Sequence, residues 1–358
     1  MGRAFTTLLS LRGLKPVMYK RGFSLGVACF AALAALPAYA ETQWNVSMWG
    51  ASRAVTVAIE YLAKQVEVRT DGDFKMVVHF GEAISPAREN IDGIAIGAFE
   101  AAHICPSYHP GKTPALLALE LPFLPFESVR AAHKVALKSH SHPVIEKELS
   151  QFNARVLQHV IAPRYEFMGR GEPPETFAAW QGKRVRAPGA IGDGVRALGA
   201  RPTSVPAPEI YTSLERGLFD AAALPFSYTF ASYRIHEVSD WYTFNMNIAI
   251  PSCVILVSQD AWTALPDEYR ALIEEINVEA YELQFEALAD ADTAWIPEFD
   301  KRGLKRVIYD EQVLQTFKTE TAQPLWDDWV KRYSRRFPAQ EYLDFIIEEA
   351  TLANVAEN

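Results

Sequence analysis

Cysteine is scarce in this sequence, with three residues among 358. This scarcity excludes a small disulfide scaffold, and 49% hydrophobic residues are ample for packed cores. Several active-site motifs are also missing, namely Gly-x-Ser-x-Gly, the P-loop, His-Glu-x-x-His and a Rossmann glycine triplet after a strand. The sequence therefore does not point to the enzyme classes that depend on these motifs.

The chain has fewer basic than acidic residues, with 35 Lys and Arg and 44 Asp and Glu, which gives a net charge of −9. The first forty residues hold five of the cations and no acid, so the remaining chain carries −14. The phosphates of a nucleic acid would repel such a chain. Nucleic acid is therefore not an expected partner.

Long apolar runs are absent except near the N-terminus, where residues 22–36 follow Lys20 and Arg21. The run has about 15 residues, fewer than the roughly 20 that a membrane-spanning helix needs. Ala38 and Ala40 then supply the small residues of a cleavage site. The pattern predicts a secretory signal peptide over 1–40, cleaved after Ala40, rather than a membrane anchor.

Apolar periodicity alternates between the two regular patterns along the remaining chain. It predicts strands at 44–50, 73–80, 100–106, 154–161, 165–171, 183–188, 220–225 and 251–258, and helices at 51–70, 86–99, 191–200 and 208–219. Strands that alternate with helices indicate parallel βαβ units and an α/β class. A chain of this length favours two lobes over a single core.

A helical pattern over 266–303 is much longer than the others. At 1.5 Å per residue, thirty residues would reach about 45 Å, longer than one small lobe. We therefore expect this helix to bridge both lobes. Pro297 is expected to bend or break it, and two packed helices are the alternative.

Three cations, Lys183, Arg184 and Arg186, stand within four residues of one predicted strand. Strand alternation places Arg184 and Arg186 on one face, with Arg186 at the carboxyl end. Ligands of open α/β sheets bind at the carboxyl ends of strands, and a guanidinium fork suits a carboxylate. Arg186 is therefore a candidate ligand-binding residue, and a surface cation paired with an acid is the alternative.

His103, Cys105 and His109 lie close together in "HICPSYH". A metal site or a cysteine nucleophile is conceivable there, but no fourth ligand and no orienting acid is evident. A buried strand that ends in a loop is the favoured interpretation. The sequence leaves open whether Cys105 and Cys253 form a disulfide.

The segment 176–225 resembles the central signature of the TRAP-transporter substrate-binding proteins, the DctP-like family. The signature runs Gly-x-Lys-x-Arg-x-Pro, a Leu-Gly-Ala turn and Glu-x-Tyr-x-x-Leu-x-x-Gly-x-x-Asp. Its matches here are Gly182, Arg184 (for Lys), Arg186, Pro188, Leu198, Gly199, Ala200, Glu209, Tyr211, Leu214, Gly217 and Asp220. "LELPFLPF" (119–126) and "LPDEYRALIEE" (265–275) are similar to further family segments, so the resemblance covers nearly the whole mature chain.

The resemblance implies a two-lobed periplasmic-binding-protein fold, the Venus flytrap, with a long helix bridging the lobes. Lobe I would comprise 41–163 and about 250–292, and lobe II 164–249 and about 293–358. The implied function is a periplasmic receptor that captures a small organic acid and delivers it to the membrane permease subunits of a TRAP transporter. The resemblance implies no catalysis, and no cofactor or metal is expected.

The family arginine at the place of Arg186 pairs with the ligand carboxylate, which implies the same role here. Many members carry a glycine and later an asparagine after the aspartate, where this chain has Ala221 and Leu224. Leu224 removes a polar contact, and the nearby Phe226 and Tyr228 add aromatic surface. These differences suggest a monocarboxylate with an apolar or aromatic body.

The remaining candidate ligand contacts come from both lobes. The family often has a second arginine about twenty residues before the signature arginine; Arg170 and Arg164 are candidates here, neither at a clean alignment. Tyr211 could border the cleft, and lobe I offers Trp49 beside Gly50, Glu82 and Tyr108.

Two other classes of function stay open from the sequence. One is a secreted two-lobed α/β hydrolase or lyase that uses Cys105 with His103 or His109. The other is a periplasmic sensor component that presents its ligand to a receptor kinase.

Overall fold

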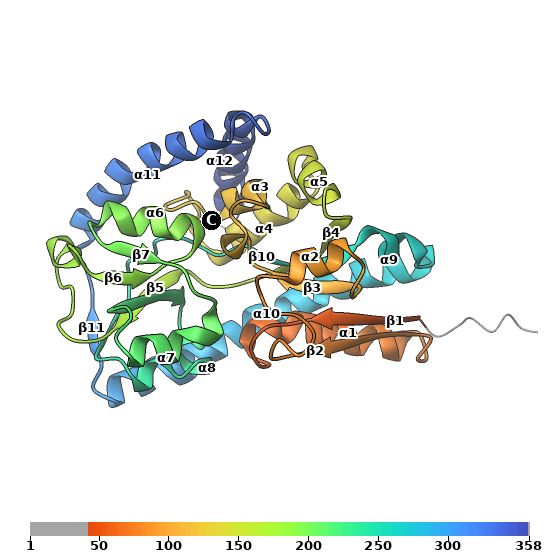
Figure 1. The fold of residues 1–358 in the computed structure, drawn as a ribbon, viewed down its shortest axis with the longest axis horizontal. Coiled ribbons are helices and arrows are strands. Elements are labelled where there is room, and N and C mark those ends of the chain that lie inside the picture. Colours follow the sequence, from red (N-terminus) through yellow and green to blue (C-terminus); the bar gives the residue numbers. More distant parts are fainter. Residues whose placement is uncertain (1–41, 357–358) are drawn as a thin grey trace, which may run out of the picture. The chain divides into compact units, whose positions relative to one another are not determined.

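Two mixed β-sheets organise the chain in a computed structural model that describes residues 42–356. The first sheet has the order β2 (Phe74–His79), β1 (Thr42–Ser47), β3 (Ala101–Ile104), β10 (Cys253–Ser258) and β4 (Ala154–Val160). The second has the order β11 (Lys305–Val307), β9 (Trp241–Thr243), β5 (Tyr165–Gly169), β8 (Ala221–Pro225), β6 (Arg184–Arg186) and β7 (Arg201–Thr203). Figure 1 shows helices packed around both sheets, which confirms the α/β class.

The sheets are not wholly parallel, contrary to the expectation of uniform βαβ units. β1 runs parallel to β2 and β3, but β10 is antiparallel to β3 and β4. β5 is likewise antiparallel to β8 in the second sheet. The reason is that the chain passes from the first sheet to the second between β4 and β5 and returns between β9 and β10. β5 and β10 are the strands that directly follow these two passages.

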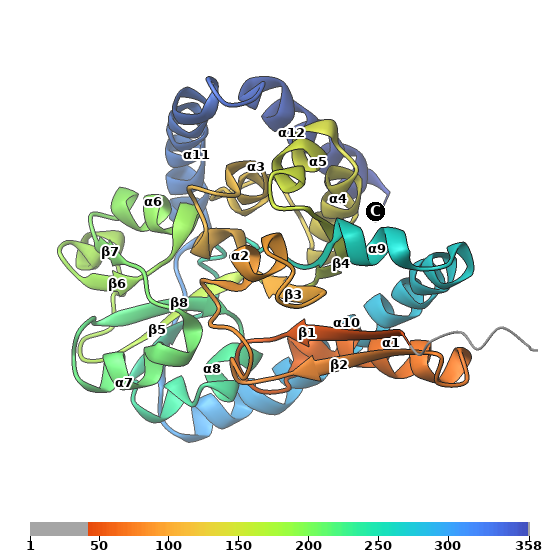
Figure 2. The same cartoon turned by 45° about the vertical axis from the view of Figure 1, so that its right-hand side comes forward.

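Helices α1 (Val57–Arg69) and α2 (Asn90–Ala95) follow β1 and β2. A group of helices covers the first sheet on another side, namely α3 (Pro114–Leu117), α4 (Val129–His140), α5 (Pro143–Ser150) and α12 (Ala339–Val355). Their apolar faces share one core with β3 and β10, and α12 packs directly on α4 (Figure 2). The sequence patterns had not predicted α3, α4, α5 and α12.

The second sheet is covered by α6 (Gly189–Ala197), α7 (Ile210–Glu215), α8 (Tyr228–Ser232) and α11 (Glu311–Tyr333). α6 begins directly at Gly189, two residues earlier than predicted. It ends before Gly199, whose φ of +78° is the left-handed conformation that glycine accepts at a helix end. α6 therefore starts at the carboxyl end of β6, next to Arg186.

α10 (Asp267–Lys301) is one continuous helix of 35 residues, and α9 (Gln259–Ala264) precedes it. Pro297 lies inside α10 without ending it, so the expected break is wrong. Trp295 and Phe299 on either side of the proline both pack against His236, and this packing supports the helix despite the lost backbone donor.

The two halves of α10 contact different sheets, as Figure 1 shows along its length. Towards its N-terminus, Asn277 accepts a hydrogen bond from Gln158 of β4, 2.8 Å away. Towards its C-terminus, Asp300 accepts one from Tyr242 of β9 at 2.6 Å. The prediction of a long helix that bridges both lobes is confirmed.

The lobe boundaries drawn from the sequence stay a prediction. Within the C-terminal segment, β11 joins the second sheet, whereas α12 packs on α4 beside the first. The predicted signal peptide lies outside the described residues. Among the residues that the structure describes, no helix is both long and apolar enough to cross a membrane.

Candidate functional site

An enclosed cavity lies where the two sheets bring their strand ends together. Its walls include residues at the carboxyl ends of β1, β3, β4, β6 and β8, and residues of α8 and the segment after it. Carboxyl ends of strands are the usual ligand-binding edge of an α/β sheet. The centre of a water-sized sphere can reach only about 30 Å³ of it, within about 440 Å³ of empty space that includes its openings, so the walls lie close together in this structure. Larger hollows occur elsewhere, but they are open and none is lined by both of the buried arginines described below.

Arg186 contributes to the cavity wall from the last position of β6. Its side chain is only 1% exposed, although Arg184 in the same strand is exposed. Arg186 donates from Nε to the carbonyl of Val205 and from Nη1 to that of Ala223, both at 2.9 Å. Nη2 donates to the hydroxyl of Tyr108 at 3.1 Å. These three bonds hold the guanidinium in place and leave two of its five N–H donors for a ligand.

Tyr108 brings the first sheet to this arginine. It ends a short 3-10 helix, Pro106–Tyr108, that directly follows β3 and Cys105. Its hydroxyl oxygen accepts hydrogen bonds both from Arg186 and from the backbone N–H of Ala207, the latter at 3.0 Å. The hydroxyl proton is then available to a ligand acceptor. Tyr108 therefore connects the first sheet to two segments of the second-sheet side.

Arg53 is a second arginine of the cavity wall, and the sequence analysis did not identify it. It is 9% exposed, and its Nη1 donates to the carbonyls of Trp49 and Ala51 at 3.1 and 2.7 Å. The guanidinium carbon lies 4.8 Å from the ring centre of Trp49 and 5.8 Å from that of Tyr233. Its position between two aromatic rings fixes the charge at the cavity without an acidic partner.

Gly50 makes this arrangement possible. Its φ is +71°, and a Cβ atom there would overlap the Tyr233 hydroxyl oxygen and lie 2.8 Å from Arg53 Nη1. Only a residue without a side chain permits this close approach. In the sequence, only the glycine that follows Trp49 at the end of the first strand indicates that side chains pack closely here. This signal places Trp49 near the cleft but does not identify Arg53.

Five polar atoms of the cavity wall are buried without a hydrogen-bond partner among the described residues. They are Trp49 Nε1, Arg53 Nη2, His103 Nδ1, Thr229 Oγ1 and the hydroxyl oxygen of Tyr233. Buried polar groups are nearly always hydrogen-bonded, and an unmade bond is costly. Their concentration around one cavity indicates a place where a bound molecule completes the bonding.

The cavity wall contains no Asp or Glu, although it holds two guanidinium groups. Glu120 lies behind the wall, where it accepts a hydrogen bond from the Ser252 backbone at 3.0 Å. Burial raises the pKa of Glu120 to about 7, so this carboxyl is only partly charged near neutrality. The site is therefore electropositive and suited to an anion.

Cys105 and Cys253 form a disulfide at the edge of the cavity, which resolves the question that the sequence left open. The bond joins the end of β3 to the start of the neighbouring β10. A bonded Cys105 has no thiolate to act as a nucleophile or a metal ligand. Burial also lowers the pKa of His103 well below its usual value, and its ring stacks on Trp49 with the centres 4.5 Å apart. The proposed use of Cys105 with His103 or His109 in catalysis is therefore wrong for this structure.

Five of the nine residues predicted to contact ligand line this cavity: Arg186, Trp49, Tyr108, Leu224 and Tyr228. Leu224 is buried at the carboxyl end of β8, so it offers an apolar contact where the family often has asparagine. Tyr228 begins α8 and is also buried.

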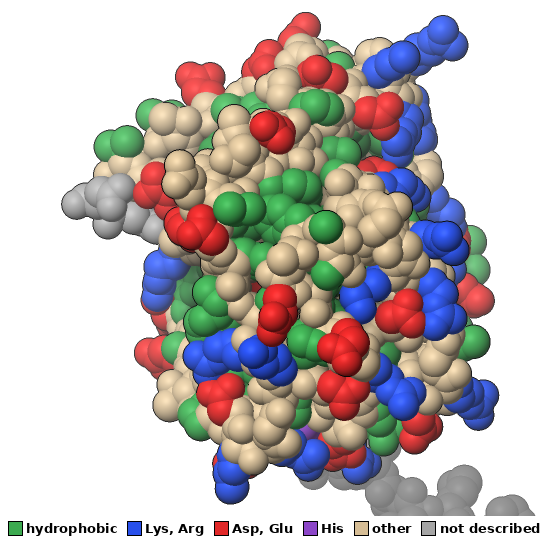
Figure 3. All heavy atoms as spheres, turned by 90° about the vertical axis from the view of Figure 1, so that its left-hand side faces the viewer, with side chains coloured by type: hydrophobic (Ala, Val, Ile, Leu, Met, Phe, Trp, Pro, Cys, Tyr) green, Lys and Arg blue, Asp and Glu red, His purple; other side chains and the backbone are tan. Residues whose placement is uncertain are grey.

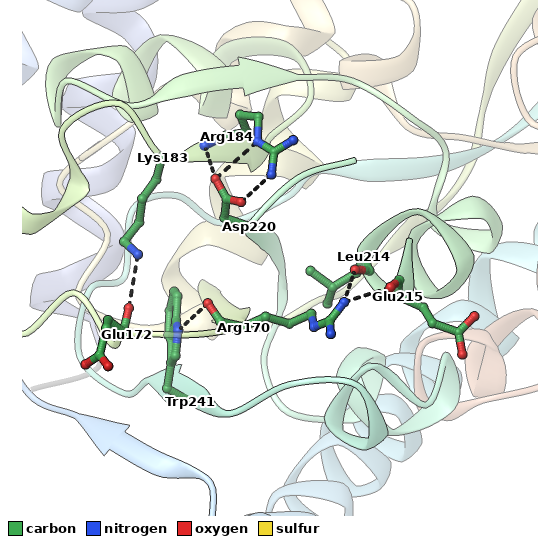
Figure 4. A network of polar contacts seen from close by, with 8 residues as sticks. All are labelled: Arg170, Glu172, Lys183, Arg184, Leu214, Glu215, Asp220 and Trp241. Carbon is green, nitrogen blue, oxygen red and sulfur yellow. Dashed lines mark hydrogen bonds and ion pairs between the residues drawn. The ribbon is translucent and has the colours of Figure 1, made fainter. Parts of the chain in front are cut away.

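The other four predicted residues lie outside the cavity lining, each for a local reason. Arg170 directs Nη1 to the carbonyls of Leu214 and Glu215, at 3.1 and 2.7 Å (Figure 4). Glu82 accepts a hydrogen bond from the backbone of Ala87. Phe226 packs among aromatic rings of the core, and Tyr211 is half-buried against the same core.

The alternative arginine, Arg164, also lies outside the lining and donates from Nη2 to the Phe126 carbonyl at 2.9 Å. The two cations beside Arg186 have partners of their own on the surface. Arg184 forms an ion pair with Asp220 at 2.6 Å, and Lys183 donates to the carbonyl of Glu172 at 3.0 Å (Figure 4). Figure 3 shows basic and acidic side chains interspersed on the neighbouring face, not a field of one sign. The three cations are thus not a basic patch.

Two lobes that enclose an electropositive cavity define the class of solute-binding receptors. Residues 46–332 match the model of the bacterial extracellular solute-binding protein family 7, DctP, and the chain belongs to this family. It is a TRAP-type solute-binding protein and not an enzyme, as the sequence analysis predicted.

Known relatives agree with this assignment. The monocarboxylate 2-oxoacid-binding periplasmic protein of Nostoc sp. is 26% identical over 282 residues, which cover 77% of this chain and 76% of the relative. A TRAP periplasmic solute-binding protein from Desulfovibrio salexigens, solved with bound orotic acid, superposes with a TM-score of 0.78 at 18% identity, covering 87% of this chain and 99% of that one. One from Rhodoferax ferrireducens, in complex with copurified benzoate, has a TM-score of 0.78 at 18% identity and covers 88% and 100%. These two structures show that the fold is shared.

Proposed function

We propose that the chain captures a small organic acid by a pairing of the ligand carboxylate with Arg186. The observation that carries this proposal is the state of that side chain. Arg186 is 1% exposed, lines an enclosed cavity and has no carboxylate partner among the described residues. A buried guanidinium without a counter-ion is unfavourable, and a carboxylate on its two remaining N–H donors would relieve that cost.

The ligand would also hold the two lobes together. Tyr108 belongs to the first-sheet side and Arg186 to the second, and the ligand carboxylate lies within reach of both groups in this proposal. A ligand that makes more contacts in the closed state shifts the population towards that state. Capture and closure are then one process.

The body of the acid would lie against apolar and aromatic surface. Leu224, Tyr228, Trp49 and Tyr108 provide this surface around Arg186. It suits the acid with an apolar or aromatic body that the sequence analysis expected, and benzoate and orotic acid, the ligands of two structural neighbours, are acids with flat rings. The receptor would be exported by its signal peptide to the periplasm and deliver the acid to TRAP permease subunits in the membrane.

The test compares Arg186→Met with Arg184→Met by isothermal titration against a panel of carboxylic acids. Arg184→Met is the matched control, because it removes a cation from the same strand outside the cavity. We expect Arg186→Met to lower affinity for every bound acid by about a hundredfold or more, in line with the loss of a bidentate charged pair of about 3 kcal/mol. Circular dichroism checks that the variant is folded. Unchanged affinity in a folded Arg186→Met protein would refute the pairing.

A further inference from the structure

The cavity has a second polar region, around Arg53, that differs from the one around Arg186. The ring of Tyr108 lies 6.0 Å from the guanidinium carbon of Arg186. Tyr108 is next to Trp49, with ring centres 5.7 Å apart, and Trp49 is next to Arg53 at 4.8 Å. The order across the wall is therefore one guanidinium, two aromatic rings and a second guanidinium.

The atoms around Arg53 are mainly hydrogen-bond donors. Arg53 Nη2 and Trp49 Nε1 can only donate, and the Tyr233 hydroxyl can donate as well as accept. All three are buried and have no partner among the described residues. A set in which two atoms can only donate and a third can donate matches a group that has several oxygen lone pairs, and a carboxylate or another oxyanion has the most of these.

Charge favours the same chemistry. Neither Arg53 nor Arg186 forms an ion pair with an acidic side chain in the described part of the chain, and no acid lines the cavity. A monoanion on Arg186 would leave the charge of Arg53 buried without an anionic partner. A ligand with a second anionic group would neutralise both.

We propose that Arg53, with Trp49 and Tyr233, binds a second oxyanion group at the end of the ligand opposite its first carboxylate. This inference rests on the proposed function, because it takes the first carboxylate to be held by Arg186. The body between the two groups would lie against the rings of Tyr108 and Trp49. The ligand class is then a flat or short acid with two anionic ends, which replaces the monocarboxylate expectation that was based on Leu224. Arg53 is a specificity-determining residue in this arrangement.

The experiment measures affinity by isothermal titration for two matched pairs of probes, benzoate with terephthalate and butanoate with succinate. The proteins are the unaltered chain, Arg53→Met, Tyr233→Phe and Arg186→Met. We expect the unaltered chain to bind at least one diacid about tenfold or more tightly than its monoacid, the range for one good charged contact. Arg53→Met should abolish this preference by lowering the affinity for the diacid to about that for the monoacid.

Tyr233→Phe keeps the test decisive if Arg53→Met fails to fold, since Arg53 also holds the carbonyls of Trp49 and Ala51. Its hydroxyl has no partner, so its removal leaves no native hydrogen bond unmade and the fold should persist. We expect Tyr233→Phe to weaken diacid binding severalfold and to weaken monoacid binding by a clearly smaller factor. Equal losses for monoacid and diacid in a folded variant would show that the residue is only structural.

The two proposals fail in different ways. If the unaltered chain binds monoacids as well as diacids, or better, the second oxyanion site is refuted while the role of Arg186 stands. If Arg186→Met binds all four probes like the unaltered chain, or none of the four is bound by any protein, the proposed function is itself contradicted for these acids. A diacid preference lost only in Arg53→Met and Tyr233→Phe supports both proposals.

Discussion

The hydroxyl of Tyr108 accepts a hydrogen bond from Nη2 of Arg186 at 3.1 Å, and this bond joins the two sheets at the ligand cavity. The same oxygen accepts from the backbone of Ala207 at 3.0 Å. A single phenol from the first-sheet side thus orients the arginine that we propose as the carboxylate anchor and binds the segment before α7. Its geometry links the position of Arg186 to the approach of the two sheets.

Tyr108→Phe should therefore weaken acid binding without unfolding the protein. The variant leaves Arg186 Nη2 and the Ala207 N–H short of an acceptor in the closed state, at a cost of about 1–3 kcal/mol. We expect the dissociation constant to rise roughly tenfold, measured by isothermal titration with whichever acid binds most tightly. Tyr211→Phe is the control, because Tyr211 is half-buried against the core away from the cavity. Equal effects of the two substitutions would contradict the role given to Tyr108.

Gly50→Ala should reduce both stability and affinity, and Gly81→Ala separates the two causes. Both glycines have φ near +70°, at +71° and +68°, so an alanine at either position costs about 1–2 kcal/mol in strain. A Cβ at Gly81 meets no atom within 4 Å, whereas one at Gly50 would overlap Tyr233 and crowd Arg53. Chemical denaturation should show the larger loss for Gly50→Ala, and titration should show lost affinity only there. Unaltered affinity in Gly50→Ala would contradict the prediction, because it would mean that Arg53 and Tyr233 can shift without any effect on ligand binding.

Local patterns identified the strands of the first sheet but not the helices α3, α4 and α5, which lie between β3 and β4. The strands β1, β2, β3 and β4 and the long helix α10 follow from apolar periodicity, which depends only on neighbouring residues. The antiparallel insertion of β10 does not follow, because it depends on a chain return over nearly a hundred residues after β4. The continuity of α10 through Pro297 also depends on distant packing against His236.

The candidate site was predictable where position in a strand decides the role. Arg186 at the end of β6 and Tyr108 after β3 were both found in that way. Arg53 was not, because nothing in the local sequence indicates that its guanidinium lies between Trp49 and Tyr233, two residues far apart in the chain. Arg170 was a candidate for the second arginine of the family without a clean alignment, and tertiary structure directs it to the end of α7.

A buried pair of histidines lies outside the ligand cavity. His133 belongs to α4 and His159 to β4, and α10 packs against them. Nδ1 of His133 and Nδ1 of His159 are 2.8 Å apart, so one ring donates and the other accepts. Tyr281 packs edge-on against His133, with ring centres 4.4 Å apart. Burial lowers the pKa of His133 to about 4, and it also lowers the pKa of His159 well below its usual value. Arg130 also lowers the pKa of His133, and Glu282 raises it by a smaller effect.

The double variant His133→Phe/His159→Phe should make the protein less sensitive to acid. Each histidine binds protons more readily when unfolded, with an ordinary pKa near 6.5, than when folded. The pair therefore contributes stability that is present above pH 6.5 and is lost as the pH falls towards 4, by up to about 3 kcal/mol for one histidine. The raised pKa values of Glu120, Glu148 and Glu166, each about 7, act in the opposite direction but are common to both proteins.

Urea denaturation at pH 7 and pH 4.5 should thus show a smaller loss of unfolding free energy on acidification in the variant. His142→Asn is the control. His142 is the half-buried N-cap residue of α5, and asparagine also caps helices well. The same acid-induced loss in the double variant as in the unaltered chain would show that the pair is not the proton-sensitive element.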